Sequence, residues 1–341
     1  MSLPSIFQGC LTLPVISSPM FLVSGPELVI EACKSGVVGT FPALNQRTSE
    51  GFEEWLIQIK AELADFEAQT GQKPAPFGVN LIVHKTNPRL EADVALCVKH
   101  QVPLIITSLG AVSQLVDAIH SYGGLVFHDV AQVRHAEKAA EAGVDGLIAV
   151  CAGAGGHAGV LSPFAFVNEI RQFFKGTVVL AGCLSTGRDI ATSQMIGADM
   201  AYMGTRFINT QESRAMEDYK EMINASSASD IVYTPEISGI PANFLKPSLV
   251  AAGLDPNTGK RPEAPVDEVK KPDLGEELTA PKEGASAWKS IWSAGQGVGS
   301  IDNVPTVQAL VAELHREYVD ATVEYAGASR EYALKPQLSQ S

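Results

Sequence analysis

Short apolar runs alternate with segments of helical periodicity along the first two thirds of the chain. Eight of these runs are rich in β-branched and aromatic residues and stay apolar at successive positions, which is typical of strands buried on both faces of a parallel sheet. The expected strands are residues 15–20, 37–44, 77–83, 103–110, 125–130, 146–150, 178–182 and 200–207.

Between these runs, polar and apolar positions recur with a helical period. The first such segment begins with Ser24 and Pro26, an N-cap followed by a first-turn proline, and ends at Gly36. The other expected helices are 49–68, 89–100, 111–121, 132–142, 163–174 and 186–196. Eight strands with seven intervening helices predict an α/β fold, a (β/α)8 TIM barrel. An open doubly wound sheet is the alternative, but it usually has five or six strands and a G-x-G-x-x-G motif after the first, and neither feature fits this chain.

The alternation stops after residue 207. Residues 213–225 have helical character, and 255–284 form a run rich in proline, glycine and acidic residues that has too little apolar content for a core. Order is expected again at 291–301, followed by an amphipathic helix from about 304 to 325. The sequence thus predicts a barrel made of residues 1–208 and 290–341, with residues 209–289 inserted after strand eight as a smaller lid over the mouth.

The composition of the chain excludes some classes of binding partner and indicates its cellular compartment. The chain has 341 residues with 38 acidic and 25 basic side chains, a net charge of -13, and no cluster of Lys and Arg with interleaved aromatics. Nucleic acid and anionic membranes are therefore not expected partners. Five cysteines without a C-x-x-C pair, no basic residue before Lys34 and no apolar run of membrane-spanning length predict a soluble cytoplasmic protein. For its assembly, a homodimer is the candidate state.

The stretch from Gly146 to Gly159 is the leading candidate for chemistry. It is an apolar strand that runs into a glycine loop carrying one histidine, His157. Glycines let the backbone approach a planar ligand closely, and barrel strands place such loops at the active-site mouth. Most histidines are structural, and the chain has seven, but this position favours His157 as an acid–base group. His128, at the end of another strand, is a weaker candidate.

The residues at the ends of the other strands complete the expected mouth. Glycine turns follow strands seven and eight, the usual phosphate cradle of a barrel, and Ser185 and Thr205 offer hydroxyl donors there. The sequence has no metal-ligand cluster, no G-x-S-x-G motif and no lysine at a strand end. A glycine-lined mouth with one histidine therefore predicts a bound organic cofactor, and flavin mononucleotide (FMN) fits best. The candidate positions are Pro19, Met20, Phe21, Asn45, Gln46, Asn80, Ser108, His128, Asp129, Gly155, Gly156, His157, Gly182, Cys183, Gly204 and Thr205.

Six motifs in barrel order carry a family resemblance. They are VISSPM, FGVNL, GAGGHAG, AGCLSTGRD, MGTRF and WSAGQ. Together they resemble the nitronate monooxygenase family, formerly called 2-nitropropane dioxygenases, over nearly the whole chain. That family comprises FMN-dependent (β/α)8 barrels and includes quinone reductases, and it resembles flavin-dependent enoyl-thioester reductases.

The resemblance implies a role for each motif. Pro19, Met20 and Phe21 would pack on the isoalloxazine ring, Asn80 would reach its polar edge, and Gly155 and Gly156 would line it. The phosphate would be held by Ala181, Gly182, Cys183, Gly204 and Thr205. His157 would be the catalytic base that takes the α-proton of a nitroalkane, or would position a substrate that is already ionised.

Some positions depart from the family pattern. Asp129, expected to contact the ribityl chain or the ring, stands where relatives often have lysine, and Asn243 stands where they tend to have arginine. Family members also often have Ser-Gly-Gly in place of Ala181, Gly182 and Cys183.

Three functions remain open from the sequence. The leading hypothesis is an FMN-dependent monooxygenase that oxidises alkyl nitronates or nitroalkanes with O2. The first rival is an NAD(P)H-dependent quinone or enoyl-thioester reductase on the same barrel. The second is a barrel that binds FMN as a sensor, or has lost it, without catalysis. The acidic Asp129 and the proline-rich segment show no phosphate site for a nicotinamide cofactor, which favours the oxidase.

Overall fold

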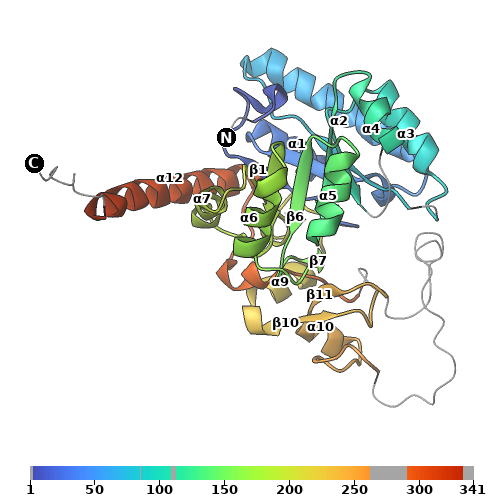
Figure 1. The fold of residues 1–341 in the computed structure, drawn as a ribbon. Helices are drawn as coiled ribbons and strands as arrows, with labels where there is room; N and C mark the ends of the chain where they lie inside the picture. The colour runs from blue at the N-terminus through green and yellow to red at the C-terminus, as the bar shows by residue number, and fades with distance from the viewer. Residues whose placement is uncertain (1–2, 85, 109–112, 262–289, 333–341) are drawn as a thin grey trace, which may run out of the picture.

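The computed structural model describes residues 3–84, 86–108, 113–261 and 290–332, and a closed barrel of eight parallel strands lies at the centre of this part of the chain (Figure 1). Neighbouring strands follow chain order, and the last pairs with the first, with Ile16 opposite Tyr202. The TIM barrel predicted from the sequence is confirmed. The strands are β1 (Val15–Ser17), β2 (Val38–Pro42), β3 (Gly78–Ile82), β4 (Leu104–Ser108), β5 (Leu125–Val130), β6 (Gly146–Val150), β8 (Thr177–Ala181) and β9 (Met200–Met203).

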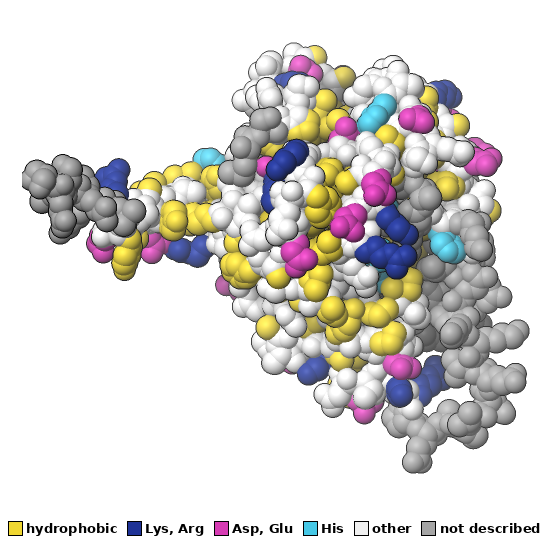
Figure 2. Space-filling view, viewed as in Figure 1, with side chains coloured by type: hydrophobic (Ala, Val, Ile, Leu, Met, Phe, Trp, Pro, Cys, Tyr) yellow, Lys and Arg dark blue, Asp and Glu magenta, His cyan; other side chains and the backbone are white. Residues whose placement is uncertain are grey.

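Helices cover the outside of the barrel. The last of them, α12, packs between α7 and α1 and so fills the position that follows the eighth strand. Its C-terminal part projects away from the body (Figures 1 and 2). The outer helices are α1 (Pro26–Lys34), α2 (Ser49–Thr70), α3 (Leu90–Lys99), α4 (Ser113–His120), α5 (Val133–Glu141), α6 (Pro163–Phe173), α7 (Gly187–Met195) and α12 (Val307–Glu331).

The barrel strands are apolar on both faces because each face meets its own core. On β5, Phe127 packs inside the barrel, while Val126 and Val130 pack under the outer helices. The bottom of the barrel is closed by the N-terminal segment η1 (Ser5–Phe7), whose Phe7 ring lies 6.1 Å from that of Phe127. This arrangement leaves the opposite end, where the strands finish, as the open mouth.

A second, three-stranded antiparallel sheet lies beside the mouth. It consists of β10 (Ile231–Thr234), β11 (Ala242–Leu245) and the very short β7 (Gly156–His157). His157 pairs with Ala242, and Gly156 pairs with Asn243. The glycine loop after β6 is therefore fixed by a segment about 85 residues further along the chain.

The region after β9 differs in detail from the expectation. The expected strand 200–207 ends at Met203, and α8 (Thr205–Ile208) follows after Gly204. All four α8 residues are buried, including the polar Thr205 and Arg206, so polarity does not mark an exposed face there, and four residues are too few to show a helical period. The other elements are η2 (Ala43–Asn45), α9 (Glu217–Asn224), η3 (Ala228–Asp230), α10 (Lys246–Ala251) and η4 (Gln296–Ser300).

Most of the acid-rich segment 255–284, expected as a surface excursion or lid, lies outside the described residues. Within the described part, Asp255 forms a turn by accepting hydrogen bonds from the backbone of Asn257 and Thr258. Among the residues that the structure describes, no helix is both long enough and apolar enough to cross a bilayer.

Candidate active site

The structure brings the candidate residues together at the carboxyl ends of the barrel strands. Pro19, Met20 and Phe21 follow β1, Asn80 lies on β3, and Asp129 lies on β5. The glycine loop with His157 follows β6. Ala181 ends β8, ahead of Gly182 and Cys183, and Gly204 and Thr205 follow β9. Their contacts also converge, because a Cβ on Gly204 would lie 2.7 Å from Ser18 Oγ and one on Gly155 would lie 3.3 Å from Thr205 Oγ1.

Three polar side chains form a relay inside the mouth. The Nδ2 atom of Asn80 donates to Ser108 Oγ at 2.9 Å, and Ser108 Oγ donates to Asp129 Oδ2 at 2.5 Å. The other carboxyl oxygen, Asp129 Oδ1, is shielded from solvent and has no hydrogen-bond partner. Burial raises the pKa of Asp129 to about 6, and the hydrogen bond from Ser108 opposes that rise. The relay therefore presents to the mouth a carboxyl that titrates near neutral pH.

The loop after β1 is held by Asn45, whose side chain bonds three of its backbone groups. The Nδ2 atom donates to the carbonyl oxygens of Met20, at 3.0 Å, and Ser24, at 2.8 Å, and Oδ1 accepts from the N–H of Leu22 at 2.9 Å. Leu22 has a φ of 63°, which is costly for a residue with a branched side chain. Asn45 thus fixes a strained loop against the mouth. The sequence marked Asn45 only by its place after the second strand.

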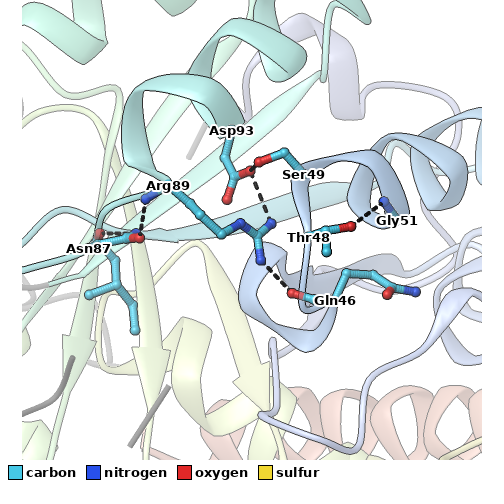
Figure 3. A network of polar contacts seen from close by, with 8 residues as sticks. Gln46, Thr48, Ser49, Gly51, Asn87, Arg89 and Asp93 are labelled. Atoms are coloured by element: carbon cyan, nitrogen blue, oxygen red, sulfur yellow. Dashed lines mark hydrogen bonds and ion pairs between the residues drawn. The ribbon is translucent and has the colours of Figure 1, made fainter. Parts of the chain in front are cut away.

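Behind Asn45, a buried network joins the loops after β2 and β3 (Figure 3). Arg89 pairs with Asp93 Oδ1 at 3.0 Å and donates to the carbonyl of Gln46, and Ser49 Oγ donates to the same Asp93 oxygen at 2.7 Å. Asn87 accepts from the N–H of Arg89 and donates to the end of β3. Because Asp93 is fully buried, removing either charge of the pair would leave the other uncompensated. The two loops are thereby held as one unit.

The segment 292–297, which contains the WSAGQ motif, is hydrogen-bonded to the loops that follow β6, β8 and β9. Ser293 Oγ accepts from Gly156 N at 2.6 Å and donates to the carbonyl of Asn243. The Asn243 side chain in turn donates to Ala154 O at 2.7 Å. Gly295 N donates to Thr205 Oγ1 at 2.9 Å. Asn243 is therefore a buried support of the glycine loop, a role that its position in the sequence does not reveal.

The turn after β8 has an unusual backbone. Gly182 has a φ of 132°, and Cys183 has a φ of 58°, a left-handed conformation that a cysteine adopts at a cost. A Cβ added to Gly153 would lie only 2.3 Å from Cys183 Sγ, so the glycine loop and this turn are in close contact. Partial burial, with the charge of Asp189, raises the pKa of the Cys183 thiol. The thiol therefore stays neutral and adds no negative charge to the turn.

The donors at this turn differ partly from the expectation. The Ser185 hydroxyl donates to Gly297 O at 2.8 Å, so its hydrogen is used to hold the 292–297 segment rather than to bind an anion. The N-terminus of α7 is capped by Thr186, whose hydroxyl accepts from Asp189 N, while the Asp189 carboxylate accepts from the N–H groups of Ser185 and Thr186. Thr205 accepts from Gly295, which leaves its hydroxyl hydrogen able to donate to a ligand. An anion at this turn would thus meet the 182–184 backbone and the Gly204–Thr205 turn.

The two candidate histidines lie in different environments. His157 lies in β7 and remains exposed at the mouth, while the surrounding protein desolvates its ring and lowers its pKa. A neutral imidazole near pH 7 is the form that accepts a proton. His128 faces outward from β5, where its Nδ1 lies 2.7 Å from Thr107 Oγ1, and burial lowers its pKa to about 4. His128 is a buried structural residue rather than part of the mouth.

The remaining ligating groups give no sign of a metal. Among the described residues, no three His, Cys, Asp or Glu side chains gather closely enough to bind an ion. The four cysteines other than Cys183 are buried, and all five are free thiols. His157 and Asp129 are therefore described by their own surroundings rather than as metal ligands.

Comparisons with known proteins identify the family of the chain. The family model described as nitronate monooxygenase matches residues 7–317. The nitronate monooxygenase of Paraburkholderia phytofirmans is 25% identical over an alignment 352 positions long, which covers 89% of this chain and 92% of that protein. A (3aS,4S,5R,7aS)-5-hydroxy-7a-methyl-1-oxo-octahydro-1H-indene-4-carboxyl-CoA dehydrogenase of Rhodococcus jostii is 27% identical over 70% of this chain. The chain spans 64% of the length of that relative.

Solved structures share the fold. FabK from Thermotoga maritima superimposes with a TM-score of 0.73 at 22% identity, covering 93% of this chain and 96% of that one. The nitroalkane oxidase from Streptomyces ansochromogenes superimposes with a TM-score of 0.74 at 21% identity, covering 94% of this chain and all of that one. At these identities the likeness extends to the barrel and its surrounding elements.

Proposed function

The chain belongs to the nitronate monooxygenase family of flavin-dependent oxidoreductases, and from this membership we propose that it is an FMN-dependent nitronate monooxygenase. Its substrates would be small alkyl nitronates or nitroalkanes together with O2. The observation that carries the proposal is the mouth itself, where a glycine-lined wall, a strained turn and one exposed histidine meet at the carboxyl ends of the strands.

The residues present fit FMN. The close approach of Gly153 to Cys183 and the positive φ of Gly182 leave backbone, rather than side chains, lining the turn where a phosphate would bind. Ala181, Gly182, Cys183, Gly204 and Thr205 would hold the phosphate. The ring would lie against Pro19, Met20, Phe21, Gly155 and Gly156, with Asn80 and Asp129 at its polar edge. A cradle sized for one phosphate and the lack of a dinucleotide fingerprint near any early strand favour FMN over FAD.

In the proposed reaction, the residues of the chain have separate roles. Bound FMN would supply the redox chemistry, accepting electrons from the substrate and passing them on to O2. His157 takes the α-proton of a neutral nitroalkane at an imidazole nitrogen, because its lowered pKa keeps the ring unprotonated near pH 7. Asn45 and the 292–297 segment hold the two walls in place, and the apolar Met20 and Phe21 limit water at the reacting face.

A second candidate is an NAD(P)H-dependent reductase of quinones or enoyl thioesters. It is favoured by the relatives in Rhodococcus jostii and Mycobacterium tuberculosis that are named as dehydrogenases of a CoA thioester, 27% and 26% identical to this chain. On this barrel, the same flavin site would relay a hydride from the nicotinamide to the substrate.

Anaerobic stopped-flow mixing separates the two candidates. The purified yellow protein is mixed with propyl nitronate in one experiment and with NADH or NADPH in another, and the flavin absorbance near 450 nm is followed. For a nitronate monooxygenase, only the nitronate bleaches the flavin rapidly, and O2 restores the colour. Rapid bleaching by a pyridine nucleotide, with none by the nitronate, would replace the first candidate by the second.

A further inference from the structure

Asp129 is an acidic side chain at the proposed flavin site, and it forms no ion pair with a basic residue in the described part of the chain. Its Oδ2 accepts from Ser108, whose own oxygen is occupied by Asn80, and its Oδ1 is shielded from water without any hydrogen-bond partner. None of the ion pairs recorded among the described residues includes Asp129. A charged carboxylate in this place is stabilised by one hydroxyl alone, and that is little compensation for the water it has lost.

We propose that binding of FMN by this chain is coupled to the uptake of one proton by Asp129. Asp129 lies on the inward face of β5 near the mouth and still keeps part of its surface exposed. A ring seated over the mouth removes the remaining water without supplying a cation. The neutral acid is the form that tolerates this loss. The inference rests on the proposed flavin site and adds to it a proton that the site must take up.

The groups around Asp129 support this assignment. On the adjacent strands its neighbours are Ser108 on β4 and the apolar Ile148 on β6, and neither titrates in the physiological range. From across the barrel, Tyr202 on β9 interacts with Asp129, and burial together with the Asp129 charge raises the pKa of its phenol, which stays neutral. His157, on the loop after β6, is a further titratable group of the mouth, and the Cys183 thiol after β8 stays neutral because its pKa is raised. His128 and His135 interact with each other on the outer side of the strand.

The direction in which flavin affinity changes with pH follows from the ionisation of Asp129 in the flavin-free protein. Asp129 has a raised pKa of about 6 before the flavin binds, so above that pH it is mostly ionised and must gain a proton on binding. Affinity for the flavin should therefore fall as pH rises. If the ionised form does not bind, the dissociation constant increases up to about fiftyfold between pH 6 and 8, and about 0.9 proton is taken up per flavin at pH 7.

The test measures flavin binding to the apoprotein by fluorescence quenching from pH 5.5 to 8.5. Riboflavin is used beside FMN, because the phosphate of FMN itself titrates near pH 6. Calorimetry at pH 7 in two buffers with different ionisation enthalpies counts the protons. The variants are Asp129→Asn, which is isosteric and permanently neutral, Asp129→Ala, and His157→Gln, which removes the other titrating group.

The wild type and His157→Gln should lose riboflavin affinity by at least tenfold between pH 6 and 8. Asp129→Asn should bind tightly with less than a twofold change, and Asp129→Ala should also lose the pH dependence. A wild-type affinity that is flat or rises with pH, or a slope that survives in Asp129→Asn, overturns the inference. A slope that disappears in His157→Gln overturns it too. Absence of flavin binding at every pH would instead refute the proposed FMN site.

Discussion

Asn45→Ala tests whether the loop after β1 is positioned from outside the flavin site. The substitution removes two hydrogen bonds to the carbonyls of Met20 and Ser24 and one from the N–H of Leu22. Ser24 is fully buried, so its carbonyl gains no water in exchange, whereas Leu22 is exposed. At about 1 kcal/mol for each bond that water does not replace, the free energy of unfolding should fall by about 2 kcal/mol.

The substitution should also weaken FMN binding, because Leu22 keeps its left-handed backbone only while Asn45 holds the loop. We expect FMN affinity to fall about fivefold to thirtyfold, because binding would then have to order the loop at a cost of about 1–2 kcal/mol. Thermal unfolding and flavin fluorescence quenching measure the two effects on the same preparation.

Thr48→Ala is the matched control. Thr48 lies three residues away and caps α2 by accepting from Gly51 N at 3.1 Å, a hydrogen bond within its own helix end rather than to the Met20 loop. It should lose about 1 kcal/mol of stability, as N-caps do, and keep its FMN affinity. Wild-type FMN affinity in Asn45→Ala, or an equal loss in both variants, would refute the assignment of Asn45 as the clamp of this loop.

Three further predictions follow from the site. His157→Ala should slow turnover of a neutral nitroalkane by roughly 10²–10⁴-fold and that of the preformed nitronate far less, since the latter has no proton to lose; equal losses in steady-state assays, with FMN content measured in parallel, would assign His157 to binding. Gly153→Ala should lose about 2 kcal/mol or more of stability and most of its FMN, because its φ is 79° and the new Cβ would lie 2.3 Å from Cys183 Sγ; adding Cys183→Ala should restore part of both, and no recovery in thermal unfolding would show that the backbone strain dominates. Acid treatment should release FMN rather than FAD, and chromatography showing FAD, or no flavin after reconstitution, would contradict the single-phosphate cradle.

The positions of the strands could be predicted from the sequence because the barrel buries both faces of each strand. Runs such as 146–150 are apolar at successive positions, and eight such runs between helices favour a barrel over an open doubly wound sheet, which usually has five or six strands. Once the barrel was inferred, the convergence of Asn80, Asp129 and Cys183 followed, since all parallel strands end at the same mouth. The same two-sided burial concealed which way each residue faces. It therefore took the structure to place His128 under the outer helices and Asp129 inside the barrel.

The contacts that hold the site in place are mainly between residues far apart in the sequence, so the sequence alone did not predict them. The strand β7 has two residues, too few for any periodicity, and it exists because Ala242 and Asn243 pair with it from far along the chain. Ser185 was expected to face a phosphate, but its hydroxyl is used by Gly297, more than a hundred residues away. Hydrogen bonds of this kind depend on which backbone groups come within about 3 Å after folding, and no local pattern records that distance.

The sequence by itself therefore determined the barrel and the end at which its mouth lies. Those features depend on periodicity, glycine positions and chain order, which are local and additive along the chain. Only the tertiary structure decided the plug formed by Phe7, the clamp formed by Asn45, and the exposure and ionisation of His157 and Asp129. Each of these depends on what surrounds a group in three dimensions, because desolvation and hydrogen-bond partners are properties of the packed environment rather than of the residue.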